Sequence, residues 1–248
     1  MRIEENMSYN FNERIEKIFT ENGLGEYLCD ATVEKFGLLL DAMLSAHLNI
    51  TAIKEPDAII LKHFADSLTI AKYIPEGARV ADIGCGGGFP SFPLAIVRPD
   101  LDVTGFDSTA KKIAYINETS VNLGLTNLKG VSLRVEEGAH ETKWREHFDF
   151  VTARAVASLP VLSEYCLPYV KVGGIFGALK AKTGADELDA SRNAILLLGG
   201  KICQSIECTL YADFEKEPLY RNIILVDKVK KTPEKYPRNN SQISKKPL

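Results

Sequence analysis

Apolar residues recur at helical spacing through the first third of the chain, without the alternation that would indicate strands. In residues 11–19, 31–48 and 57–73, a stripe of isoleucine, leucine, phenylalanine or methionine returns every three or four positions, which predicts amphipathic helices. Asn12 is a candidate cap for the first of them. Because these helices have no strands to pair with, we predict that residues 1–75 form a helical cap, and such additions often shape the substrate side of a common core.

From Ala78 onward, short apolar runs of strand length alternate with helical stretches. The runs that predict strands are residues 79–83, 102–107, 130–135, 148–153, 175–180, 201–209 and 219–227. The helical stretches between them are residues 90–98, 109–123, 158–170 and 184–198. This alternation predicts an α/β fold, in which a mostly parallel seven-stranded sheet over residues 76–228 carries helices on both faces. Two successive strands at the end predict a terminal hairpin.

The stretch Val80–Pro90 (VADIGCGGGFP) is the part of the core that points to chemistry. It predicts a strand that runs into a glycine-rich turn, with Pro90 as the first residue of the next helix, a position that suits proline. Such a turn presents backbone N–H groups at a helix N-terminus, and glycines let a ligand approach the main chain closely. The pattern therefore indicates a nucleotide-like ligand.

Two details of this stretch choose between a dinucleotide and S-adenosylmethionine (SAM). A dinucleotide-binding turn requires a third glycine or alanine where this chain has Phe89, and the glycines present, Gly84, Gly86 and Gly88, follow a G-x-G-x-G pattern instead. Asp82 precedes the turn, and a carboxylate there would repel a pyrophosphate but suits a ligand that carries an ammonium and a sulfonium group. Both details favour SAM.

Asp107 supports the same site from the next predicted strand. It lies about 20 residues beyond the turn, where an acidic residue holds ribose hydroxyls in nucleotide-binding folds. The alternative, a glycine-rich turn that binds no ligand, requires these features to coincide by accident.

Composition places the chain among globular proteins. Its 248 residues are 45% apolar and 25% charged, which fits a single α/β unit with additions. No uncharged apolar run approaches the roughly 20 residues that span a bilayer, and the acidic N-terminus is not a secretory signal, so we expect a cytoplasmic protein with no membrane partner. The five cysteines are odd in number and lack metal-binding spacing, which predicts reduced thiols and no metal.

The net charge of −3 is unevenly distributed along the chain. Residues 228–248 contain seven lysines and arginines against one glutamate, a charge of +6, which leaves −9 for the rest. A basic tail on an acidic body is a common arrangement for contacting a phosphate backbone. We therefore consider residues 229–248 a basic tail that contacts nucleic acid or, equally well from charge alone, a tail that only improves solubility.

Several motifs together resemble a known family. They are DIGCGGGFP, FPLAIVRP, FDS, RVEE and VTARAVA in the core, LNITAI and KHFADSL upstream of it, and KYPR and KKPL in the tail. In this combination and order they resemble the bacterial ribosomal RNA small-subunit guanine-N7 methyltransferases, the glucose-inhibited division protein B group. The resemblance covers residues 8–248. A G-x-G-x-G turn alone is shared by most SAM enzymes, whereas LNITAI, H-F-x-D-S-L and ARAVA at these spacings are specific.

The resemblance implies a class I, Rossmann-like SAM-dependent methyltransferase that acts on N7 of one guanine in the decoding-region (530) loop of 16S rRNA. Its partner would be 16S rRNA or the small ribosomal subunit, and we expect a monomer. By resemblance, the donor contacts Gly84 and Phe89 in the turn, Val135 and Glu136 at the adenine end, and Arg154 at the border of the site. Our own additions to this cofactor set are Asp82, Gly86 and Asp107, on the arguments above.

The residues after the fourth strand exclude other methyl acceptors. Amino-group methyltransferases have a D/N/S-P-P-Y/F/W turn there, whereas this chain has Ala153, Arg154 and Ala155. Carbon-5 methylation of pyrimidines needs a cysteine nucleophile, and the one nearby, Cys166, is predicted to be buried in a helix. A ring nitrogen such as guanine N7 carries a free lone pair at neutral pH, so alignment and exclusion of water suffice and no acid/base pair is needed.

Contacts to RNA are less specified by the sequence. Arg154 is the candidate for positioning the acceptor, and other basic residues near strand ends or helix starts are Lys111, Lys112, Arg134 and Lys180. His63 and Asp66 share a face of the third predicted helix, in a structural or a substrate role. The chain departs from the family at three places. Ser91 and Ala181 each stand where the family usually has glycine, and Gly105-Phe106 stands where it usually has two aliphatic residues. Two alternatives remain open: a SAM methyltransferase for a small molecule or protein, and a SAM-binding RNA module without turnover.

Overall fold

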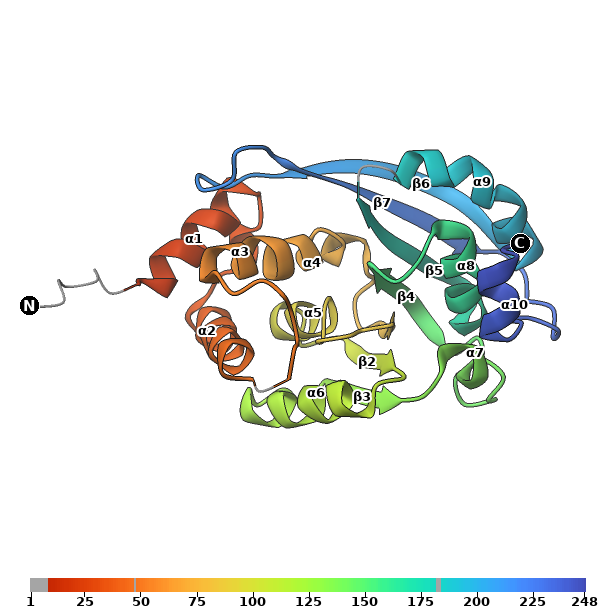
Figure 1. The fold of residues 1–248 in the computed structure, drawn as a ribbon, viewed down its shortest axis with the longest axis horizontal. Coiled ribbons are helices and arrows are strands. Elements are labelled where there is room, and N and C mark those ends of the chain that lie inside the picture. Colours follow the sequence, from red (N-terminus) through yellow and green to blue (C-terminus); the bar gives the residue numbers. More distant parts are fainter. Residues whose placement is uncertain (1–8, 47, 182–183) are drawn as a thin grey trace, which may run out of the picture.

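A single sheet of seven strands organises the computed structural model, which describes residues 9–46, 48–181 and 184–248 (Figure 1). The strands are β1 (Arg79–Ile83), β2 (Asp102–Asp107), β3 (Leu128–Ser132), β4 (Phe148–Arg154), β5 (Val170–Ala181), β6 (Gly200–Leu210) and β7 (Leu219–Lys228). Their order in the sheet is β3-β2-β1-β4-β5-β7-β6. β1 to β5 pair in parallel, and β7 pairs antiparallel with both β5 and β6. The predicted α/β class and the terminal hairpin are confirmed.

Alternate residues of each strand enter different layers of the core, because successive side chains of a strand point to opposite faces of a sheet. On β1, Val80 packs in one apolar layer and Ala81 in the other. Ile223 and Ile224 of β7 divide in the same way. The sheet is therefore covered on both faces, and its strand order reverses between β1 and β4, where ligands bind in folds of this kind.

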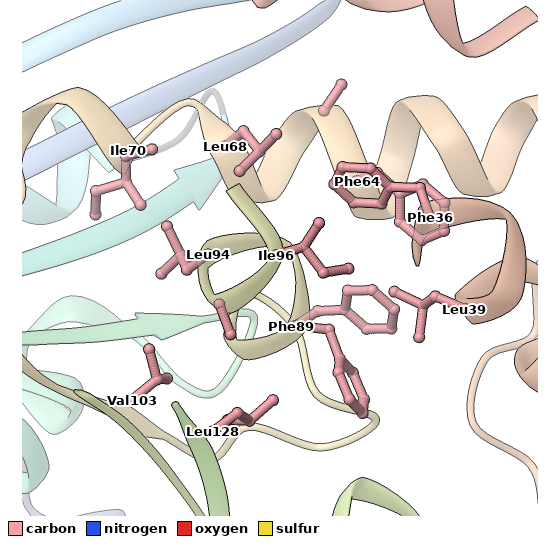
Figure 2. Packing of buried hydrophobic residues seen from close by; sticks show 14 of the residues in the cluster. Phe36, Leu39, Phe64, Leu68, Ile70, Phe89, Leu94, Ile96, Val103 and Leu128 are labelled. Atoms are coloured by element: carbon pink, nitrogen blue, oxygen red, sulfur yellow. The ribbon is translucent and has the colours of Figure 1, made fainter. Parts of the chain in front are cut away.

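The first layer joins the N-terminal helices to those that follow β1 and β2. Its elements are α1 (Phe11–Glu21), η1 (Gly25–Tyr27), α2 (Asp30–Ser45), α3 (Pro56–Ile59), the π-helical turn η2 (Ile60–Ala65), α4 (Asp66–Leu68), η3 (Ala71–Tyr73), α5 (Ser91–Val97) and α6 (Ala110–Asn122). Figure 2 shows Phe36 and Phe64 of the N-terminal helices close to Phe89 of the glycine-rich turn. The ring centroids of Phe36 and Phe64 lie 4.9 Å apart, and those of Phe64 and Phe89 lie 6.3 Å apart.

The second layer holds the later helices and the end of the chain. Its elements are α7 (Val135–Gly138), α8 (Leu159–Cys166), η4 (Leu167–Tyr169), α9 (Gly184–Leu197) and α10 (Asn240–Lys245). Residues 229–248, predicted as a basic tail, fold back onto this layer, where Ile243 is fully buried and Arg238 pairs with the buried carboxylate of Glu164. In Figure 1, α1 and α10 lie at opposite ends of the molecule. The division into cap, core and tail stays a prediction, and these contacts show what joins its parts.

Four of the local predictions that differ from the structure concern the ends of these elements. The cap of α1 is Asn10, whose side chain accepts the N–H of Glu13, and Asn12 lies inside the helix. Pro90 is the residue before α5, which begins at Ser91, because the preceding residues are held in the glycine-rich turn. The third predicted helix ends at Leu68, and residues 71–73 form a separate 3-10 turn.

The fourth difference concerns the end of β3, which stops at Ser132 although its apolar alternation continues. The N–H groups of Glu137 and Gly138 donate to the carbonyl of Arg134 and start the short helix α7. Val135 and Glu136 are therefore on a helix rather than on a strand end.

Candidate functional site

The glycine-rich turn between β1 and α5 is tied to the neighbouring strand. The N–H groups of Gly84 and Cys85 donate to the carbonyl of Phe106 at 2.8 and 3.0 Å. Gly84 has a φ of +72°, and a Cβ placed there would come within 2.7 Å of the Val156 side chain. Both facts require glycine at this position, because other residues rarely adopt this φ and none would fit beside Val156.

A cavity of about 440 Å³ opens at the carboxyl ends of β1, β2 and β4. It is lined by the predicted cofactor residues Gly84, Gly86, Phe89, Asp107, Val135, Glu136 and Arg154. The other lining residues are Ile50, His63, Ile83, Cys85, Gly87, Ser108, Lys112, Leu133, Arg134, Ala155, Val156, Tyr165 and Asn240. The fold thus brings together all of the predicted cofactor residues except Asp82.

Asp107 holds the turn and faces the cavity. Its carboxylate accepts the N–H of Gly86 at 3.1 Å and the N–H of Thr109 at 2.8 Å. A carboxylate has about four lone-pair sites, so two remain for hydroxyl donors of a ligand. This geometry suits the ribose role predicted for Asp107.

Asp82 is fully buried and lies outside the residues that line the cavity. One carboxylate oxygen accepts the hydroxyl of Ser91 at 2.6 Å and its N–H at 3.2 Å, while the other oxygen is buried without a hydrogen-bond partner. Burial raises the pKa of Asp82 to about 6, and the hydrogen bonds from Ser91 oppose this shift. In the structure Asp82 therefore holds the start of α5, and Ser91 supplies the hydroxyl that a glycine at this position would lack.

Arg154, the last residue of β4, reaches the N-terminal helices across the edge of the cavity. Its guanidinium donates to the carbonyl of Lys62 at 2.8 Å, to the carboxylate of Asp66 at 3.0 Å and to Nδ1 of His63 at 3.1 Å. It also lies 5.5 Å from the ring centroid of Phe89, a cation–π distance. These contacts fix the Arg154 side chain between the cavity and the N-terminal elements η2 and α4.

His63 is held as a neutral imidazole. Because its Nδ1 accepts a hydrogen bond from Arg154, its Nε2 carries the proton, which it donates to the Thr51 hydroxyl at 2.8 Å. The imidazole stacks on Phe89 with ring centroids 4.8 Å apart. Burial, together with the charge of Arg154, lowers the pKa of His63 to about 4. His63 therefore serves as a rigid, uncharged neighbour of Arg154 at neutral pH.

A second cavity, of about 370 Å³, lies on the other side of Arg154. It shares His63, Arg154 and Ala155 with the first and is otherwise lined by Asp66, Leu179, Lys180, Ala181 and Arg221. Ala155 has a φ of +56°, which is rare for a residue other than glycine and is often found at functional sites. The two cavities thus meet at Arg154 and Ala155.

The cations of this second cavity are partly compensated. Arg221 donates to Asp66 at 2.7 Å, and Lys180 donates to the carbonyl of Ala157 and to Glu187, each at 2.8 Å. The three cationic side chains of this cavity, those of Arg154, Arg221 and Lys180, therefore share two carboxylates, those of Asp66 and Glu187.

Tyr165 of α8 and Asn240 of α10 also line the first cavity, and the sequence analysis missed both. The Tyr165 hydroxyl donates to the side-chain carbonyl of Asn240 at 2.5 Å. The one signal that pointed to this region was the KYPR motif in the tail, which precedes Asn240.

The remaining candidate residues separate into two groups. Lys112 and Arg134 line the first cavity, whereas Lys111 faces the groove between α2 and α6. The thiols of Cys85 and Cys166 are buried, which raises the pKa of each well above its usual value, so neither is a thiolate nucleophile. Within residues 9–46, 48–181 and 184–248, no group of three or more His, Cys, Asp or Glu side chains is placed to hold a metal ion. In the same ranges, every helix is too short or too polar to cross a membrane.

The first cavity fits an adenosine ligand with a cationic amino-acid side. A Cβ on Gly86 would meet only the carbonyl of Gly84, at 3.9 Å, so a side chain there would take up cavity space that the glycine leaves to a ligand. The unpartnered oxygen of Asp82 leaves a negative group beneath the same turn. Asp107 and Glu136 add acceptors for hydroxyl or amino groups, and the ring of Phe89 is an apolar contact.

Comparisons with known proteins identify relatives over most of the chain. The family model for rRNA small subunit methyltransferase G matches residues 33–212. The ribosomal RNA small subunit methyltransferase G of Clostridium perfringens is 43% identical over 219 residues, which are 87% of this chain and 90% of that protein. The protein of the same name from Acetivibrio thermocellus is 40% identical over 241 residues, 95% of this chain and 97% of that protein.

Solved structures share the fold at low sequence identity. A SAM-dependent methyltransferase from Aquifex aeolicus is similar with a TM-score of 0.50 and 16% identity, over 69% of this chain and 93% of that chain. A branched-chain polyamine synthase from Thermus thermophilus is similar with a TM-score of 0.55 and 13% identity, over 82% of this chain and 64% of that chain. The seven-stranded sheet therefore belongs to the class I methyltransferase architecture.

Proposed function

This chain belongs to the rRNA small subunit methyltransferase G family and is a SAM-dependent methyltransferase of small-subunit rRNA, and we propose that its target is N7 of one guanine in the decoding-region loop of 16S rRNA. The observation that carries the proposal is the pair of cavities that meet at Arg154. The first has the residues for a SAM molecule, and the second provides cationic side chains beside it for an RNA nucleotide.

Different residues of the first cavity would contact different parts of the donor. SAM, when bound, supplies a methyl group on a positively charged sulfur. The backbone of Gly84 and Gly86 would border its amino-acid side, the carboxylate of Asp107 would accept the ribose hydroxyls, and Val135 and Glu136 would surround the adenine. Asp82 would act on the donor only through its negative charge beneath the turn.

The second cavity suits an acceptor that needs no deprotonation. Guanine N7 has a free lone pair, so the site has to align it and to exclude water. The surroundings agree with this requirement, because the Nδ1 lone pair of His63 is already used by Arg154 and the nearby thiols stay protonated. Arg154 and Arg221 would hold an RNA phosphate, and such a contact positions the nucleotide.

We further propose that the protein acts as a monomer in the cytoplasm, on 16S rRNA or on the small ribosomal subunit. Arg154 would act as a positioning residue, because a cation directly at the ring would oppose the positive charge that N7 methylation creates on the base.

Two measurements test this function. Titration calorimetry should show binding of SAM and of S-adenosylhomocysteine and no binding of NAD. Mass mapping of 16S rRNA from cells that lack this chain should show one guanine without its N7 methyl group, and the purified protein should restore it. NAD binding without SAM binding would refute the donor assignment. Transfer to a protein or a small molecule, or SAM binding without any turnover on rRNA, would refute the acceptor assignment.

A further inference from the structure

The donor cavity is closed by two parts of the chain that come from opposite faces of the sheet. Ile50, from the connection between α2 and α3, and His63, from η2, reach it on one side, and Asn240 reaches it from the C-terminal segment. Resting on the proposed donor, we infer that residues 229–248 complete the SAM site and that Asn240, oriented by Tyr165, binds the adenosine half of SAM. This role differs from the phosphate contacts that the charge of the segment suggested.

The C-terminal segment is fastened to the part of the core that carries Val135 and Glu136. Just after α7, the guanidinium of Arg145 donates to the carbonyls of Thr232 and Tyr236, each at 3.0 Å. The carboxylate of Glu146 accepts the N–H of Thr232 at 2.7 Å. The two sides of the adenine end of the cavity are therefore linked by hydrogen bonds between side chains of the core and the main chain of the C-terminal segment.

Further along the segment, its anchors lead directly to Asn240. His140 Nε2 lies 2.9 Å from the carbonyl of Pro237. The guanidinium of Arg238 contacts both oxygens of the fully buried Glu164, at 2.9 and 2.6 Å, and Ile243 of α10 is fully buried as well. In Figure 1, α10 lies beside α8, which carries Tyr165. Asn240 thus occupies a fixed place between two buried anchors, whereas a free basic tail would have none.

The side chain of Asn240 is oriented for donation. Its carbonyl oxygen accepts two hydroxyl groups, from Tyr165 at 2.5 Å and from Ser244 at 3.2 Å. With its oxygen engaged in this way, the amide has its two N–H groups left for a partner in the cavity. Tyr165 also lies close enough to Glu136 for the carboxylate to contribute to the raised pKa of its phenol, after burial as the larger cause. An amide donor and a carboxylate acceptor at one end of the cavity match the ring nitrogens and the amino group of adenine.

The basic side chains of the same segment serve a different surface. Lys230, Lys231, Lys235, Lys245 and Lys246 are exposed, and the cavity is lined by none of them. A contribution of these lysines to RNA binding is compatible with a contribution of Asn240 to donor binding, and the two can be tested separately.

Titration calorimetry with the full-length protein and two ligands, S-adenosylhomocysteine and 5′-methylthioadenosine, tests the inference. Asn240→Ala should weaken both ligands by the same factor, about tenfold, because both contain the adenosine half. Tyr165→Phe, which removes only the hydroxyl that orients Asn240, should weaken both by about threefold. Ser241→Ala is the matched control, since Ser241 is the next residue of α10, is exposed and does not line the cavity.

Three outcomes decide the matter. Unchanged affinity of both ligands in folded Asn240→Ala and Tyr165→Phe would overturn the inference and leave the proposed function standing. A loss confined to S-adenosylhomocysteine would also overturn it, because the contact would then be with the amino-acid half. Failure of the wild-type protein to bind either ligand would refute the proposed donor itself, and the inference with it. Thermal unfolding without ligand shows which variants are folded.

Discussion

The guanidinium of Arg154 lies 3.0 Å from the carboxylate of Asp66, and this ion pair joins the end of β4 to the N-terminal helix α4. Asp66 accepts a second guanidinium, that of Arg221 on β7, at 2.7 Å. One buried carboxylate therefore connects α4 to two strands of the sheet. Because both arginines line the second cavity, the shape of the proposed acceptor site depends on the N-terminal helices as well as on the sheet.

Arg154→Ala should reduce kcat/KM for rRNA methylation by on the order of 100-fold, since misplacement of a substrate by about an ångström is that costly. Arg154→Lys should recover only part of the rate, because a lysine cannot supply the planar fork that serves Lys62, Asp66 and His63 together. Single-turnover kinetics measures both effects. The control is Arg192→Ala, an exposed arginine of α9 that pairs with Asp189 and lines neither cavity. Turnover by Arg154→Ala at the rate of the control would exclude Arg154 from the site.

Gly84→Ala should abolish detectable SAM binding, whereas Gly77→Ala should leave it unchanged. Both glycines have a positive φ, +72° and +65°, so both variants should lose about 1 kcal/mol of stability from backbone strain. Only the Cβ at Gly84 meets another side chain, that of Val156, at 2.7 Å, while the Cβ at Gly77 has no atom within 4 Å. Calorimetry and urea unfolding separate the two effects. Equal SAM affinity in the two variants would show that the turn tolerates a side chain.

The glycine-rich turn and the mostly parallel sheet could be predicted because their signals are local. Gly84 and Gly86 follow one strand and Asp107 ends the next, and the carboxyl ends of parallel strands lie at one edge of the sheet. Asp82 shows the limit of such reasoning. Its place before the turn suggested contact with a ligand, but its carboxylate accepts hydrogen bonds from Ser91, nine residues later.

Contacts between distant parts of the chain carried no local signal. Arg221 and its partner Asp66 are 155 residues apart in the sequence, and Tyr165 and Asn240 are 75 residues apart. The charge of the C-terminal segment suggested a basic tail, because the sequence pattern does not show that Ile243 is buried or that Arg238 pairs with the buried Glu164. Tertiary packing, which a one-dimensional pattern does not contain, decided these features.

The pKa of His63 predicts a pH dependence of stability. Its folded value of about 4 lies below the ordinary value of 6.5, so the folded state binds fewer protons than the unfolded state between these two values. The contribution of the neutral His63 to the free energy of unfolding is fully present above pH 6.5. It is lost as the pH falls toward 4, and the loss is at most about 3 kcal/mol. Urea unfolding of the wild-type protein and of His63→Asn at several pH values measures it, because other titrating groups cancel in the difference. A difference that does not change with pH would contradict the buried, neutral state of His63.

Replacing the exposed lysines Lys230, Lys231, Lys235, Lys245 and Lys246 by glutamine should weaken RNA binding and flatten its salt dependence. Each cationic contact that is lost lowers the log–log slope by roughly 0.9 on duplex-like RNA and by roughly 0.7 on single strands. The affinity for S-adenosylhomocysteine should not change, since none of these lysines lines the cavity. Filter binding at several salt concentrations gives the slope. An unchanged slope would leave these lysines with solubility as their role.

Removing the guanidinium of Arg238 should destabilise the whole protein rather than loosen only its end. Glu164 is fully buried, and Arg238 contacts both of its oxygens through the side chain and one of them through the main-chain N–H. Arg238→Ala leaves a buried carboxylate without its cation, which should cost about 3 kcal/mol or more of unfolding free energy. The double variant Arg238→Met/Glu164→Leu removes both charges and should be the more stable of the two, because no buried charge then lacks a partner. Urea unfolding at pH 7 compares them, with Lys235→Ala as an exposed control on the same segment. If Arg238→Ala is as stable as Lys235→Ala, the C-terminal segment is attached without this ion pair.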